Sequence, residues 1–297
     1  MSFLEALQDN SVLQFAAFGA IGASIASGII GSYVVVKRIV SMSGSIAHSV
    51  LSGLGCALWL QRTYDLPWLS PLYGALFAAI LSALIIGWVH LHYQEREDAV
   101  IAMIWSLGMA TGVIFVSQVP GYNVELMHFL LGNILWVTPS DLMILITLNS
   151  VILLVVILFY HRFLALCFDE KQAFLQGVRV NQLYLLLLVL IALSTVLLIH
   201  IVGVILVLSM LALPASIAGN FTKRLSAMMV IAVLLNITFS IGGLAISYHL
   251  DWPAGATIAL FTGGVYLLSL RFRHSTKGVI PSPVKADSSK RVSGSNG

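Results

Sequence analysis

The stretch Ser41-Met42-Ser43-Gly44-Ser45-Ile46-Ala47-His48-Ser49-Val50-Leu51-Ser52-Gly53-Leu54-Gly55 decides both the fold class and the functional hypothesis for this chain. It lies inside a long apolar region, yet it is rich in small and hydroxylated residues and contains a histidine. In a helix, five of its positions are spaced to share one face. They are Ser41, Ser45, His48, Ser52 and Gly55. A polar stripe at membrane depth predicts either a functional groove or a close helix–helix contact through small residues.

The composition around this stretch is that of a membrane protein. Of the 297 residues, 59% are hydrophobic and 9% are charged, whereas soluble domains contain about 25% charged residues. The apolar runs are too long for barrel strands of about ten residues. The sequence therefore predicts an all-α polytopic bundle of eight or nine transmembrane spans. The two cysteines form no spaced motif, which argues against a disulfide framework or a zinc knuckle.

The chain contains a series of apolar runs that are long enough to cross a membrane. They cover residues 12–36, 39–60, 71–88, 99–116, 142–160, 182–218, 227–248 and 254–270. The run 182–218 is too long for one crossing, so His200 and Gly203 near its middle predict a reversal or a break, and Pro214 predicts a second irregularity. His161 and Arg162 are expected to close the fifth span. The apolar piece 126–137 is too short to span at about 20 residues per crossing, and we interpret it as a re-entrant or interfacial helix.

Two segments are expected to lie outside the spans: the insert at 168–177 and the tail at 271–297. Residues 1–270 are expected to form one transmembrane domain, and residues 271–297, rich in Ser, Lys and Gly, a disordered cytosolic tail. The insert FDEKQAFLQG at 168–177 predicts a short helix of about two turns that Asp169 caps and Gly177 terminates. It carries Phe174 beside charged residues such as Glu170. Such a helix either docks into a partner's groove or lies on the membrane surface.

The basic residues test this arrangement of spans. If Lys37 and Arg38 are cytosolic and the spans alternate, every Lys and Arg except Arg62 falls inside, which is 14 of 15. This bias fits the positive-inside rule and supports the re-entrant interpretation of 126–137. It predicts an external N-terminus and a cytosolic C-terminus. The first ten residues lack a basic segment, so we expect no cleaved secretory signal.

The chain carries no motif for chemistry of its own. No GxxxxGK[ST] loop is present to hold a nucleotide, and neither an HExxH zinc motif nor a GxSxG turn occurs. We therefore expect a transport subunit rather than an enzyme, so that any ATP-driven work requires a separate subunit. No permanently bound cofactor and no nucleic-acid partner are expected.

Among the histidines, His48 is the strongest metal-ligand candidate. It lies about ten residues beyond the Lys37–Arg38 pair, near mid-membrane, and a neutral imidazole is a good ligand for zinc, iron or manganese. Hydrogen bonding to a neighbouring helix is the alternative. Weaker candidates are His200 and, in the short apolar piece, His128 with Glu125. For His200 the alternative interpretation is a donor to backbone carbonyls freed at the break.

Four segments, taken in order, resemble one family. Residues 43–53 resemble the "GDxLxHxxLxG" segment of the permease subunits of ATP-binding-cassette importers for zinc, manganese and iron, the family of bacterial zinc-uptake permeases. LGNILWVTPSDL (131–142) is similar to its "LxGxLLxVxxxDL" segment. DEKQAFLQGV (169–178) is similar to its cytosolic "DxxxAxxxGv" helix. IVGVILVLSMLALPASIA (201–218) is similar to "xVGxLLxxxLLxxPAAxA".

The resemblance implies a permease that dimerises with a like or unlike subunit in the bacterial cytoplasmic membrane, surrounded by lipid. Two cytosolic ATPases would dock on the helix around Asp169, Glu170, Phe174 and Gly177, and an extracytoplasmic metal-binding protein would deliver the ion. In the family pattern, an aspartate and a histidine line the metal route. Here His48 takes the histidine position, but Gly44 stands in place of the aspartate, and Ser52 stands where many members have proline.

The missing carboxylate bears on the choice of metal. Because it removes a hard oxygen ligand, its loss should weaken manganese binding more than zinc binding, and it also fits pairing with a second permease that retains the carboxylate. Ser41, Gly44, Ser45 and Ser52 are expected to line the route beside His48. Two other functions stay open: a permease for cobalamin or siderophores, and a stand-alone channel or secondary carrier.

Overall fold

The computed structural model describes residues 3–93, 97–119, 132 and 134–272. Within these ranges the chain is helical and contains no strand. The elements are α1 (Phe3–Asp9), α2 (Ser11–Val36), α3 (Val40–Thr63), α4 (Pro71–His92), α5 (Glu97–Ser117), η2 (Ile134–Trp136), α7 (Pro139–Phe168), α8 (Glu170–Leu175), α9 (Val180–Val202), α10 (Val204–Phe221), α11 (Leu225–Leu250) and α12 (Ala254–Phe272).

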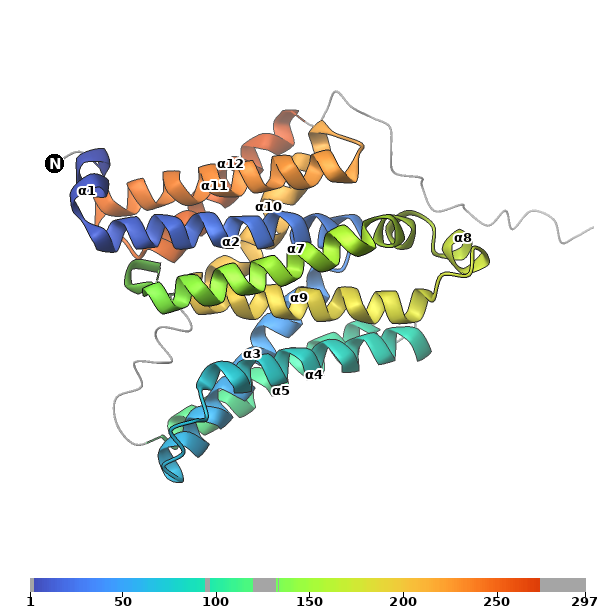
Figure 1. Cartoon of the computed structure of the whole chain (residues 1–297), viewed down its shortest axis with the longest axis horizontal. Helices are drawn as coiled ribbons and strands as arrows, with labels where there is room; N and C mark the ends of the chain where they lie inside the picture. Colours follow the sequence, from blue (N-terminus) through green and yellow to red (C-terminus); the bar gives the residue numbers. More distant parts are fainter. Residues whose placement is uncertain (1–2, 94–96, 120–131, 133, 273–297) are drawn as a thin grey trace, which may run out of the picture.

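The long helices form one bundle along the longest axis of the molecule (Figure 1). Eight helices in the described ranges are long and apolar enough to cross a membrane. The ninth long helix, α3, is less apolar than these eight and carries the stretch discussed above. The predicted all-α polytopic bundle is therefore confirmed. In Figure 1, α1 lies at one end of the bundle and α8 at the other, while α3, α4 and α5 form a group at one side.

Helix boundaries follow the expected chemistry at several places. Gly203, with φ +80°, separates α9 from α10, which confirms a break at this position, because glycine adopts this backbone conformation without steric cost. Thr138 and Asp141 form a capping box at the start of α7, and Pro139 occupies its first turn. Pro214, expected to mark an irregularity, lies inside α10, which stays helical on both sides of it.

Two predicted boundaries need correction or cannot be followed. The expected end of the fifth span at His161 and Arg162 is wrong, since α7 continues to Phe168. The continuation is stabilised by Phe163, which is wholly buried and packs edge-on against Tyr33 of α2 at 5.4 Å between ring centroids. Most of the predicted re-entrant piece, and the predicted tail beyond α12, lie outside the described residues.

Helices α2 and α9 are buried along most of their length, in contrast to α5 and α7. Buried amides tie the helices to one another. Asn149 of α7 donates to the Gly22 carbonyl of α2 at 2.9 Å, and Asn236 of α11 donates to the Met210 carbonyl of α10 at 3.0 Å. Because the membrane core offers no water to satisfy polar groups, such bonds fix which faces of the helices meet.

Helix α3 is clamped between α4 and α5 by direct backbone contact. A Cβ atom added to Gly53 would lie 2.0 Å from the Gly74 carbonyl oxygen of α4, and one added to Gly74 would lie 2.1 Å from that of Gly53. On the α5 side, a Cβ on Gly108 would lie 2.6 Å from Cα of Ser49, and one on Gly112 would meet Leu51 at 2.5 Å. The three helices therefore pack only as closely as these glycines permit.

We expect Gly53→Ala to destabilise the protein. The new methyl group overlaps backbone rather than a movable side chain, so α3 and α4 must separate, and overpacking of this kind costs about 1–3 kcal/mol. The measurement is the midpoint of thermal unfolding in detergent. Gly263→Ala on α12 is the matched control, because nothing lies within 4 Å of its added Cβ. Equal midpoints for the two variants would contradict the close backbone contact between α3 and α4.

Candidate functional site

His48 lies in the third turn of α3, about 12 Å along the helix from Val40 at 1.5 Å per residue. Its ring is half-buried and stacks on the indole of Trp105 in α5, with 4.3 Å between centroids and 14° between planes. Within the described part of the chain, its ring nitrogens have no hydrogen-bond partner. The stack therefore fixes the plane of the ring while both nitrogens keep their capacity to bind. The alternative of a structural hydrogen bond to a neighbouring helix is not what this geometry shows.

Gly44 lies one turn before His48 on the same face of α3 and is buried. A Cβ added there would lie 3.4 Å from Cδ2 of Leu208 in α10 and 3.8 Å from Cζ3 of Trp105. These are ordinary van der Waals distances, so the position has room for the start of a side chain. Gly44 and His48 thus share Trp105 as a neighbour where α3, α5 and α10 approach one another.

The three serines of the stripe have different surroundings. Ser45 is wholly buried and donates to the Ile101 carbonyl of α5 at 2.8 Å. Ser52 is half-buried and donates to the Ser49 carbonyl of its own helix at 2.7 Å. Ser41 is exposed in the first turn of α3. Ser45 therefore makes a helix–helix contact, whereas the ring nitrogens of the half-buried His48 have no hydrogen-bond partner among the described residues.

The other candidate ligands lie elsewhere or outside the described ranges. His200, in the last turn of α9, contacts Asp141 of α7 at 2.9 Å between Nε2 and Oδ1. Its partner is thus a carboxylate, and not the freed backbone carbonyls expected at the break. Asp141 also accepts from the backbone and the hydroxyl of Thr138 at 2.9 and 2.8 Å. His128 and Glu125 lie outside the described residues.

No cluster of three or more His, Cys, Asp or Glu side chains that could hold a metal ion occurs in the described ranges. Within the described residues, His48 is therefore not part of a cluster that could by itself hold a metal ion.

The short helix α8 matches its predicted start and end. Asp169 is the N-cap, and its carboxylate accepts from the backbone of Gln172 at 2.9 Å. Gly177 follows the helix with φ +78°. Phe174 is 71% exposed and Leu175 is 84% exposed. Helix α8 therefore presents large apolar side chains away from the bundle.

Three residues important to this arrangement were not identified from the sequence. Trp105 lies in an ordinary apolar span and carries no signal of its role as a stacking partner. Asp141 reads as a helix cap, which does not disclose its contact with His200. Lys37 reads as a charge that stops a span, although its ammonium group bonds to residues 129 and 133 positions away.

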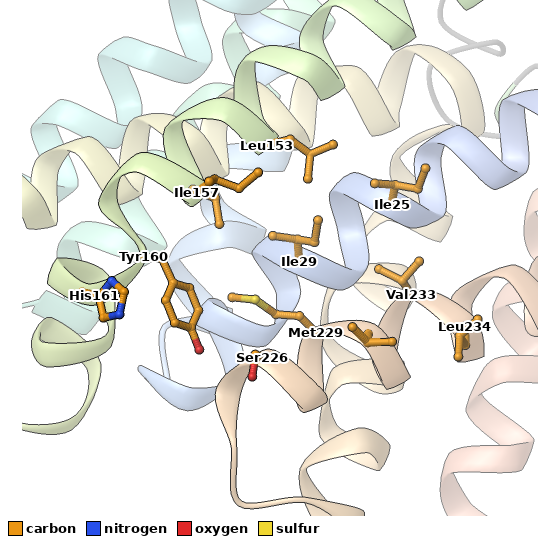
Figure 2. A pocket seen from close by; sticks show the side chains of 12 residues that line it. Ile25, Ile29, Leu153, Ile157, Tyr160, His161, Ser226, Met229, Val233 and Leu234 are labelled. Atoms are coloured by element: carbon orange, nitrogen blue, oxygen red, sulfur yellow. The ribbon is translucent and has the colours of Figure 1, made fainter.

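An apolar groove of about 590 Å³ lies between α2, α7 and α11 (Figure 2). Isoleucine, leucine, valine and methionine side chains line most of it, and the hydroxyl groups of Tyr160 and Ser226 lie at one end. Several of its lining side chains, such as Ile157 and Leu234, are exposed at the surface of the bundle. No residue of α3 or α5 contributes to its lining, so this groove is separate from His48.

Comparison with known proteins gives a consistent result. Residues 9–273 match the ABC 3 transport family. The chain is 55% identical to a "Probable metal transport system membrane protein" of Chlamydia trachomatis serovar D, over 91% of this chain and 92% of that protein. It is 31% identical to the "Manganese transport system membrane protein MntC" of Halalkalibacterium halodurans, over 91% of this chain and 90% of that protein.

A solved structure agrees with these sequence matches. The structure of PsaBC from Streptococcus pneumoniae in complex with Fab superposes with a TM-score of 0.80 at 31% identity, over 90% of this chain and 94% of the matched chain. This chain therefore belongs to the ABC 3 transport family of membrane proteins.

Proposed function

We propose that this chain is the membrane-spanning subunit of an ATP-driven importer of divalent transition-metal ions. The observation that carries the proposal is His48, whose imidazole lies inside the bundle of a transport-family protein and whose nitrogens have no hydrogen-bond partner among the described residues. A half-buried polar side chain at membrane depth is costly and marks a functional site by default. The ion is the transported substrate rather than a resident cofactor.

His48 alone would hold an ion weakly, so further ligands must come from outside the described residues. A second permease subunit packed beside α3 and α5 is the natural source, and it could supply the carboxylate that Gly44 lacks. The relatives named for manganese support manganese as the first ion to test. The missing carboxylate instead favours zinc, so the two lines of argument make opposite predictions that transport assays can separate.

The proposal includes an orientation in the membrane and a set of partners. The N-terminus would lie outside and α8 inside, because this orientation places nearly all basic residues in the cytosol. Cytosolic ATP-binding subunits would then dock on the exposed Phe174 and Leu175, and an extracytoplasmic metal-binding protein would deliver the ion at the opposite end. The chain itself carries no nucleotide-binding loop, which makes ATP hydrolysis the task of those partners.

His48→Ala should lower metal uptake by at least about tenfold, since even outer-shell partners of metal ligands cost 10- to 100-fold when removed. The measurement is the initial rate of manganese, zinc and iron accumulation in cells that lack their own uptake systems. His249→Ala, an exposed histidine at the end of α11, is the control. Unchanged uptake of all three ions by His48→Ala would remove this residue from the route.

Gly44→Asp should shift selectivity toward manganese. The Cβ fits beside Leu208, and the new carboxylate would stand one turn from His48 and add a hard oxygen ligand. The quantity to compare is the ratio of the apparent KM values for manganese and zinc in the same vesicles. Gly44→Ala controls for the added bulk without the charge. The same ratio in Gly44→Asp and Gly44→Ala would argue against a metal position at this turn.

Phe174→Asp should uncouple the ATPase subunits, because it places a charge in the centre of an apolar docking surface. We expect normal membrane insertion, reduced co-purification of the ATPase and loss of ATP-dependent uptake. Phe221→Asp, which is equally exposed at the end of α10, is the control. Retained co-purification and uptake in Phe174→Asp would show that α8 is not the docking helix.

A further inference from the structure

The turn between α2 and α3 is held tightly by the last turn of α2. The backbone amides of Lys37, Arg38 and Ile39 donate to carbonyls of residues 33, 35 and 34 at 2.9, 3.1 and 3.0 Å. Arg38 adopts a left-handed conformation with φ +61°. Helix α3 then begins at once, with the Ser43 amide donating back to Ile39 at 3.2 Å. Movement of this corner must therefore move the start of α3.

The Lys37 side chain connects this corner to α8. Its ammonium group donates to the Leu166 carbonyl in the last turn of α7 at 3.1 Å and forms an ion pair with Glu170, the first residue of α8. The Lys37 side chain is only 14% exposed, whereas Glu170 is 44% exposed. A mostly buried ammonium group is expensive without its carboxylate, so the pair holds α8 and the corner together.

A second contact leads from Lys37 to α3 through α9. The Lys37 ammonium lies 6.0 Å from the ring centroid of Tyr184, at the outer limit of a cation–π contact. The hydroxyl group of Tyr184, which is buried, donates to the sulfur of Met42 at 3.2 Å. Met42 lies in the first turn of α3, six residues before His48. Lys37 is therefore joined to α3 both through the backbone and through packed side chains.

Helix α8 has few other side-chain contacts through which its movement could displace the bundle. Of its six residues only Ala173 is buried, while its remaining side chains face outward. Apart from its covalent connections to α7 and α9, α8 has a charged contact with the end of α2, the Lys37–Glu170 pair. The end of α2 leads directly into α3, which carries His48.

We propose that Lys37 and Glu170 transmit the movement of α8 to α3, and so couple ATPase docking to the environment of His48. This inference rests on the proposed function, because it takes α8 as the ATPase-docking helix. Lys37 is here a positioning residue: it contacts no ion, and it acts by making the corner before α3 follow α8. Because α3 is one continuous helix, a shift at its start carries the stretch from Val40 to His48 with it.

The test follows α3 directly and does not depend on metal transport. The full-length permease, in complex with its ATPase subunits, has Cys56 and Cys167 replaced by alanine and carries Ser41→Cys in the exposed first turn of α3. The rate of maleimide labelling is measured with and without vanadate-trapped nucleotide, and the ratio of the two rates reports nucleotide-driven movement of α3. Co-purification of the ATPase is recorded for every variant.

Lys37→Met and Glu170→Gln should each weaken the nucleotide response by roughly 2- to 30-fold, the range for residues that modulate coupling between sites. Lys37→Met should leave the ATPase bound, because Lys37 lies outside α8 and Phe174 and Leu175 are unchanged. Glu170 belongs to the docking helix itself, so co-purification shows whether Glu170→Gln changes docking as well. The double variant should respond like either single variant, since both remove the same interaction. If Lys37→Met misfolds because it changes a buried residue, Glu170→Gln still tests the pair, since Glu170 is partly exposed. Lys171→Met is the control on α8.

Wild-type ratios in both single variants, or additive effects in the double variant, would overturn the proposal. If the unsubstituted chain itself gives no nucleotide response and binds no ATPase, the proposed function fails and this inference fails with it. A wild-type response that persists in Lys37→Met and Glu170→Gln instead leaves the importer function intact and removes only the Lys37–Glu170 link.

Discussion

The arrangement of this protein depends on how closely the backbone of α3 approaches α4 and α5. A Cβ atom added to Gly53 would lie 2.0 Å from the carbonyl oxygen of Gly74, and one added to Gly74 would lie 2.1 Å from that of Gly53. In a bilayer no hydrophobic force draws helices together, because lipid tails are as apolar as leucine, so close packing and interhelical hydrogen bonds must do so. On the other side of α3, the close approach of Gly108 to Ser49 brings α5 near enough for Trp105 to stack on His48.

The polar atoms of α3 divide according to whether the packing satisfies them. Ser45 is buried and bonded to the carbonyl of Ile101, so it adds to the contact with α5. His48 stacks on Trp105 but keeps its nitrogens free in the described structure. Since an unsatisfied polar group is expensive at membrane depth, this difference is the reason why His48, and not Ser45, is the candidate functional residue on this helix face.

Both ends of the bundle are tied by charged side chains. At the end that carries α8, Lys37 joins α2, α7 and α8. At the start of α7, Asp141 joins the cap of that helix to His200 of α9. Between these ties the helices meet mainly through apolar side chains, with a few buried polar contacts such as that of Asn149 with the Gly22 carbonyl.

Composition, helix caps and the apolar runs by themselves determined the all-α membrane fold, the break at Gly203 and the short helix from Asp169 to Gly177, because these depend on local propensity and on the cost of polar groups in lipid. The end of α7 was missed, since only tertiary burial of Phe163 explains why a helix continues past His161 and Arg162. The spacing of the stripe placed His48 on one face of α3 but left its role open. Tertiary structure alone decided that Ser45 is a contact, that Trp105 stacks on His48, and that Lys37 reaches Glu170, because each depends on residues distant in the chain.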